Sequence, residues 1–167
     1  MAVAELTAEV GERPGWRAVG LPSEHGGWGL TLEPVLLGLL AAWSVAGAAL
    51  GVAAFLAFLV RTPAKLVAVD VWRRRWLSRS QLALRIATVE AGVLLAAIAV
   101  ATVRSGWGWL VPVLVASPLV AVEVWFEVRS RGRRLVPELC GAVAVASVSA
   151  SIVIAAGAGG RLAAGVW

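Results

Sequence analysis

The amino-acid sequence predicts an all-α protein: a polytopic transmembrane helix bundle with about five spans, the start of a sixth, and an interfacial amphipathic helix. Composition is the first observation behind this prediction. Of the 167 residues 60% are hydrophobic and 15% are charged, whereas about 25% are charged in soluble domains. Long uncharged runs are the second, because about 20 apolar residues cross a bilayer. Several of the nine Trp residues lie at the ends of these runs, where membrane proteins carry an aromatic belt.

The chain divides into a polar N-terminal tail, residues 1–20, and a transmembrane domain, residues 21–167. The tail contains Glu5, Glu9 and Glu12 and has no apolar core, so it lacks the pattern of a signal peptide. We predict that this tail is mobile and cytoplasmic.

The predicted spans follow the apolar runs. They lie near residues 28–43, 46–60, 86–103, 109–125 and 137–156. The first two come from one run, which fits a single tilted helix or a tight hairpin that turns near Trp43. We favour the hairpin, because the run is too long for one span. Gly47 and Gly51 have the small-xxx-small spacing that allows close helix contact. Residues 161–167 are the start of a further apolar segment.

The segment 61–85 is the main basic part of the chain. Its cations are Arg61, Lys65, Arg73, Arg74, Arg75, Arg79 and Arg85. Apolar residues, among them Trp72 and Trp76, recur between these cations at three- and four-residue spacing, which is typical of an amphipathic helix in the membrane surface. We therefore predict such a helix, with membrane lipids as partners and anionic headgroups bound at Arg73, Arg74 and Arg75.

The distribution of the cations also predicts the topology. With the N-terminus in the cytoplasm, all but two of the 15 Lys and Arg residues, Arg104 and Arg161, fall on the cytoplasmic side. The positive-inside rule is reliable for short loops, so the sequence predicts a multi-pass protein of the cytoplasmic membrane. The positive-inside rule also accounts for the net charge of +5. We therefore expect no nucleic acid as a partner.

Residues 21–34 form a polar, glycine-rich entrance to the first span. They include Glu24, Trp28, Glu33 and the only histidine, His25. One histidine without other ligands at suitable spacing makes a poor metal site, so neither a metal nor a cofactor is predicted. The glycines favour a non-helical turn. This turn is either an anion-binding nest at the helix start or an interfacial turn anchored by Trp28.

Several side chains near the cytoplasmic ends of the spans are candidates for a ligand-binding site. They are Glu24, His25, Trp28, Glu33, Arg61, Glu90, Glu123, Arg134 and Glu138. Ionised carboxylates inside a membrane are costly unless paired, and such residues often have a function. We expect Glu33, Glu90 and Glu123 to form one pocket, with the entrance segment as its cover. The alternative is a set of ion pairs that only fixes helix packing.

The entrance segment resembles a known family. Leu21–Trp28, which reads Leu-Pro-Ser-Glu-His-Gly-Gly-Trp, resembles the opening of YwiC-like bacterial membrane proteins, together with Glu33-Pro34 and Leu36-Leu37-Gly38. Arg61-Thr62-Pro63 and Arg134–Leu139 are also similar to segments of that family. The resemblance implies a polytopic membrane protein without an established activity.

Three function classes remain open, and the sequence does not decide whether the protein is an enzyme. Binding of a small polar or anionic ligand fits the Glu/Arg/His cluster. A role as an assembly subunit, in a homo-oligomer or a larger membrane complex, fits the small size and the Gly/Ala-rich helices. The layout of the family is also similar to UbiA-type prenyltransferases, which hold a lipid diphosphate through Mg²⁺ on aspartate-rich motifs. This chain has a single Asp, Asp70, so that activity is disfavoured.

Overall fold

The computed structural model describes residues 15–22, 25–129 and 135–167. Within these residues all regular structure is helical and no strand occurs, which confirms the all-α prediction. The helices are α2 (Trp16–Gly20), α3 (His25–Ala41), α4 (Val45–Trp72), α5 (Ser78–Ser105), α6 (Leu110–Val128), α7 (Leu135–Ala155) and α8 (Gly160–Val166).

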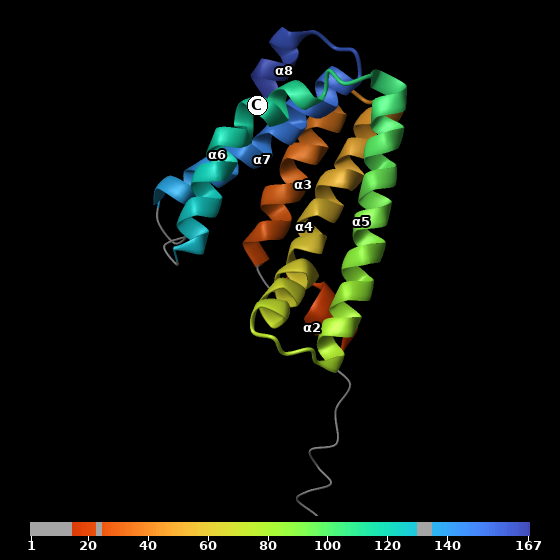
Figure 1. Ribbon diagram of the computed structural model, residues 1–167. Coiled ribbons are helices and arrows are strands. Elements are labelled where there is room, and N and C mark those ends of the chain that lie inside the picture. Colours follow the sequence, from red (N-terminus) through yellow and green to blue (C-terminus); the bar gives the residue numbers. More distant parts are fainter. Residues whose placement is uncertain (1–14, 23–24, 130–134) are drawn as a thin grey trace, which may run out of the picture.

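The helices form two groups that meet at α7 (Figure 1). In the first group α3, α4 and α5 lie side by side, and α4 and α5 form the most extensive antiparallel pair. In the second group α6 lies along α7 and contacts no other described helix. Helix α2 lies at the end that carries the α4–α5 turn, and α8 lies at the opposite end (Figure 1). The central helix α7 contacts α3, α4, α5, α6 and α8.

The long apolar run near the N-terminus forms two helices, as the hairpin interpretation expects. Helix α3 ends at Ala41 and α4 begins at Val45. Ser44 caps α4, because its Oγ accepts a hydrogen bond of 2.9 Å from the backbone N–H of Gly47, which would otherwise lack an intrahelical partner. The turn therefore lies where the predicted spans were divided.

Glycines bring the helices of the core close together. A Cβ atom at Gly47 would lie 2.9 Å from Cγ2 of Ile152 on α7, and one at Gly51 would lie 2.7 Å from Cγ1 of Val35 on α3. Ile152 is fully buried. The pair Gly47 and Gly51 thus serves the close helix contact that its spacing predicts.

Three of the described helices, α4, α5 and α7, are long and apolar enough to cross a membrane. Helices α3 and α6 contain shorter apolar stretches, residues 26–41 and 110–126. Length and composition therefore indicate a membrane protein, whereas the number of about five spans stays a prediction.

The predicted interfacial helix over residues 61–85 is wrong. Residues 61–72 continue α4, residues 73–77 form a turn, and Ser78 begins α5. Pro63 on α4 and Ala83 on α5 are buried in the hairpin, whereas Trp72 and Trp76, from which the spacing was read, are exposed. Sequence spacing shows an apolar helix face but not whether lipid or another helix covers it.

The last residues of the predicted mobile tail are packed. Helix α2 lies against both α4 and α5, and its residues Val19 and Gly20 are buried. A Cβ at Gly20 would lie 3.4 Å from the side chain of Ile86. The tail prediction is therefore wrong for residues 16–20, and residues 1–14 lie outside the described part of the chain.

Candidate functional site

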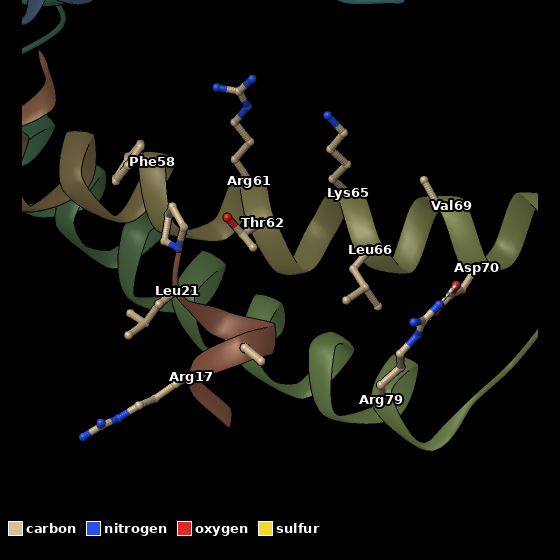
Figure 2. Close-up of a pocket in the computed structure, with 12 residues that line it drawn as sticks. Arg17, Leu21, Phe58, Arg61, Thr62, Lys65, Leu66, Val69, Asp70 and Arg79 are labelled. Atoms are coloured by element: carbon tan, nitrogen blue, oxygen red, sulfur yellow. Dashed lines mark hydrogen bonds and ion pairs between the residues drawn. The ribbon is translucent and has the colours of Figure 1, made fainter. Parts of the chain in front are cut away.

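A groove of about 830 Å³ lies between α2, α4 and α5, beside the α4–α5 turn (Figure 2). Four cationic side chains line it: Arg17, Arg61, Lys65 and Arg79. Asp70 is the one acidic residue among the described residues of its lining. Because the cations come from three helices, the groove exists only when the α4–α5 hairpin and α2 are packed together.

The two cations of α4 are held side by side. Arg61 and Lys65 are four residues apart and extend from the same side of α4, whereas Leu66 and Asp70 point toward the other two helices (Figure 2). Residues at this spacing lie on adjacent helical turns, with Cβ atoms about 5–6 Å apart. One anion can therefore contact both side chains. Arg17 points away from α4 (Figure 2), and its guanidinium carbon lies 5.5 Å from the centre of the Trp16 ring.

The charge of Asp70 is already matched within the protein. Its carboxylate accepts hydrogen bonds from Nη2 of Arg79 at 3.0 Å and from Oγ of Ser80 at 2.7 Å. The Asp70 side chain is almost fully buried, while that of Arg79 is half exposed. This pair holds the first turn of α5 against the last turn of α4.

The apolar wall of the groove connects it to the entrance segment. Phe58 lines the groove, and its ring packs edge-on against Trp28, with 5.4 Å between ring centres and an angle of 77°. Such aromatic pairs stabilise packing beyond the area they bury. A Cβ at Gly27 would lie 2.7 Å from the Phe58 ring, so only glycine leaves room for this ring. Gly27 and Trp28 thus position one wall of the groove.

A family model described as YwiC-like protein matches residues 21–153. The chain belongs to the YwiC-like family. The match includes the entrance segment and every groove residue of α4 and α5, whereas Arg17 lies before it. No curated protein and no solved structure matches the chain.

The entrance segment of this YwiC-like chain is helical, because α3 begins at His25 and includes Gly26, Gly27 and Gly29. The predicted non-helical turn is therefore wrong for the residues from His25 on. Helical glycines do not form a backbone nest, and Gly27 serves close packing instead. Glu24 and the side chain of His25 lie outside the described part, so their role as a cover stays a prediction.

The YwiC-like chain does not bring Glu33, Glu90 and Glu123 into one pocket. Glu33 lies on an exposed part of α3. Glu123 lies on α6, where a Cβ at Gly141 of α7 would come within 2.9 Å of its carboxyl carbon. Among the described helices α6 contacts only α7, so Glu123 is separated from the acids of α3 and α5. The sequence placed the three acids at a similar depth near the cytoplasmic ends of their spans. A similar depth does not show which helices are neighbours.

Glu90 differs from the other two acids because one of its carboxyl oxygens is buried without a described hydrogen-bond partner. It is seven residues after Ala83 and eleven before Ala101, which are about two and three helical turns, so it shares their helix face. Both alanines are fully buried. Atom Oε2 of Glu90 is buried and has no hydrogen-bond partner among the described residues.

The remaining candidates are divided between the two helix groups of the YwiC-like chain. Arg61 lines the groove and Trp28 supports its wall. Glu138 is exposed in the first turn of α7, and Arg134 lies outside the described residues. Sequence reasoning did not select Lys65, Asp70 or Arg79 for the site. The four-residue spacing of Arg61 and Lys65 was visible, but the pairing of Asp70 with Arg79 depends on a turn that the predicted interfacial helix excluded.

Proposed function

We propose that this YwiC-like protein is an integral membrane protein that binds a small anion, with a phosphate or carboxylate group, in the groove between α2, α4 and α5. The observation that carries this proposal is the lining itself. Four cations line one groove, and the single acid among its described lining residues is held by one of them. A ligand that carries negative charge is attracted to a lining with several cationic side chains.

The chemistry of the two α4 cations suits such a ligand. The guanidinium of Arg61 offers a planar fork of donors that matches phosphate and carboxylate oxygens, and the ammonium of Lys65 offers three donors from a point charge. Hydrogen bonds between ionised partners are about twice as strong as neutral ones. Thr62, which also lines the groove, adds a hydroxyl next to Arg61 in the sequence. These groups can therefore donate hydrogen bonds to one side of an anion.

Binding is favoured over catalysis by what the lining offers. The described lining residues include no histidine and no cysteine, so they supply no nucleophile with an adjacent base of the usual kind. Among the described residues no group of three or more His, Cys, Asp or Glu side chains lies together in a way that would hold a metal ion.

The groove faces the cytoplasm in this proposal. The described cations lie mainly on α2 and around the α4–α5 turn, at the groove end, whereas Arg104 lies in the last turn of α5 and Arg161 lies in α8. Figure 1 shows α8 at the opposite end from that turn. By the positive-inside rule, the end rich in Arg and Lys is cytoplasmic. The ligand would then be an anion available in the cytoplasm.

Anion binding to the purified full-length protein tests the proposal. Isothermal titration with inorganic phosphate and with a dicarboxylate is expected to show binding that the double variant Arg61→Gln/Lys65→Gln weakens by at least about tenfold for each cation removed, because hydrogen bonds to charged groups contribute about 1.5–3 kcal/mol. Asp70→Asn should have the opposite effect and strengthen binding, since it removes the negative charge of the groove. The control is Arg104→Gln, at the other end of α5. Equal affinity of the double variant and the wild type would exclude the groove as the site.

A second candidate function, an assembly subunit, is favoured by the position of α6. Among the described helices α6 contacts only α7, and a hollow of about 790 Å³ on its outer side is lined by apolar residues such as Val113, Val120 and Val124. In a homo-oligomer this side would meet a second copy. Oxidative cross-linking of Ser117→Cys in a Cys140→Ser background is expected to give a covalent dimer in native membranes. Exclusive monomer would contradict a homo-oligomer through α6.

A further inference from the structure

The turn between α4 and α5 forms an exposed tip, defined here as Trp72–Leu77. The side chain of Trp72 is 83% exposed and that of Trp76 is 51% exposed. Between them Arg73, Arg74 and Arg75 are all exposed. The tip itself contains no acidic residue. Two Trp side chains and three adjacent Arg side chains are thus exposed at the same tip. None of these five residues lines the groove.

The tip is held in shape by hydrogen bonds. Ser80 Oγ accepts one from the backbone N–H of Leu77 at 3.1 Å and donates one to Asp70. The backbone N–H of Arg75 donates to the carbonyl of Asp70 at 2.9 Å. Arg74 has a φ of 52°, a left-handed conformation that residues with a side chain rarely adopt. The surrounding contacts therefore fix a backbone that would not form by itself.

This backbone leaves a hollow beside the tip. It has a volume of about 470 Å³ and is lined by Trp72, Arg73 and Arg75. Two guanidinium groups next to an indole can bind a phosphate oxygen and remain in contact with the glycerol region of a lipid. The charge of these residues matches an anionic surface, where each basic residue adds to attraction. Trp is the residue that gathers at the headgroup level of membranes.

We propose that the tip docks on the anionic surface of the bilayer, with a lipid headgroup phosphate between Arg73 and Arg75 and the indoles of Trp72 and Trp76 at headgroup level. This proposal is independent of the anion-binding groove, because the tip residues are different.

The length of the hairpin agrees with this position. Helices α4 and α5 have 28 residues each, which corresponds to about 42 Å at 1.5 Å per residue. A bilayer with its headgroups is about 40–45 Å thick. Trp43, just before α4, is 73% exposed and suits the opposite surface. If Trp43 lies at one membrane surface, the tip of the hairpin lies at the headgroups of the opposite leaflet.

The test uses the full-length protein with Leu77→Cys in a Cys140→Ser background, labelled with an environment-sensitive fluorophore. Nanodiscs of phosphatidylcholine alone are compared with nanodiscs that also contain phosphatidylglycerol. Anionic lipid is expected to shift the emission to the blue, and high salt should reverse the shift because it screens surface charge. The double variant Arg73→Gln/Arg75→Gln should need at least about tenfold more anionic lipid for the same shift. The matched control is Arg104→Gln, which should respond like the parent protein.

Other outcomes would overturn the proposal. Equal emission in both lipid compositions would mean that the tip does not recognise anionic lipid. The same blue shift on addition of inorganic phosphate to phosphatidylcholine nanodiscs would mean that the hollow binds free phosphate. Trp76→Ala provides an independent measurement if the arginine variant fails to fold, because its loss of the shift would support docking and an unchanged shift would contradict it.

Discussion

Replacement of Gly38 by alanine is expected to lower the free energy of unfolding by about 1–3 kcal/mol, the usual cost of an added methyl group in a tightly packed site. Gly38 faces α7 at the point where α3 crosses it. A Cβ there would lie 2.9 Å from the carbonyl oxygen and 3.0 Å from the Cα of Ser149. Both are backbone atoms, so no side-chain rotation relieves the contact. Helix α3 would have to move away from the central helix.

Thermal unfolding in detergent measures this effect, with Gly92→Ala as the matched control. Gly92 also lies inside a helix, but no atom lies within 4 Å of a Cβ placed there. The control is expected to be neutral or slightly stabilising, because alanine is the better helix former. A Gly38→Ala protein as stable as the control would show that α3 and α7 are not in close contact.

Replacement of Glu90 by leucine is expected to raise the free energy of unfolding by about 1–3 kcal/mol, the cost of leaving a buried polar group without a partner. Glu90 lies on the α5 face that also carries the buried alanines, and its Oε2 has no partner among the described residues. Leucine has a similar size and removes the buried polar atoms. Glu90→Gln should give a smaller gain, since its amide still lacks partners.

The measurement is again thermal unfolding, with Val89→Leu as the control for added hydrophobicity on a side chain that is 66% exposed. If Glu90→Leu is less stable than the wild type, its carboxyl group has a stabilising partner, such as a buried water molecule. If Glu90→Leu is more stable but no longer binds the anion, the buried carboxyl is kept for function at the expense of stability.

The sequence was sufficient for those parts of the fold that depend on local composition. Apolar runs predicted helices, and the length of the first run predicted the turn before Val45. The spacing of Gly47 and Gly51 predicted close contacts, and both glycines face neighbouring helices. These features depend on residues near one another in the chain, for which helix geometry alone determines the outcome.

The basic segment could not be assigned from spacing. In Arg61–Arg85 a three- and four-residue period is compatible with one surface helix and with two limbs of a hairpin. What distinguishes them is the contact of Asp70 with Arg79 and Ser80, which forms only after the chain has reversed. A search for opposite charges that a turn would place together would have favoured the hairpin.

The residues proposed for a ligand site stay a prediction, and the structure brings only some of them near the groove. Arg61 and Trp28 were selected and lie at the groove or its wall. The acids were grouped by their depth, that is, by their position along the axis of each predicted span. This position contains no information about the lateral arrangement of the helices. Depth does not show that α6 lies on the far side of α7 from α4 and α5, so Glu123 was grouped with residues that it does not approach.

The position of α7 has a consequence for biosynthesis. This helix lies at the centre of the molecule, yet it follows α3, α4, α5 and α6 in the chain. Helices α3 and α6 leave the ribosome before α7, their main packing partner, exists, and domains form from the N-terminus as synthesis proceeds. Until α7 is inserted, the surfaces at Gly38 of α3 and Gly47 of α4, which face α7 in the folded protein, are covered only by lipid or by another membrane protein. A chaperone that occupies this surface during synthesis would have to leave when α7 enters the membrane.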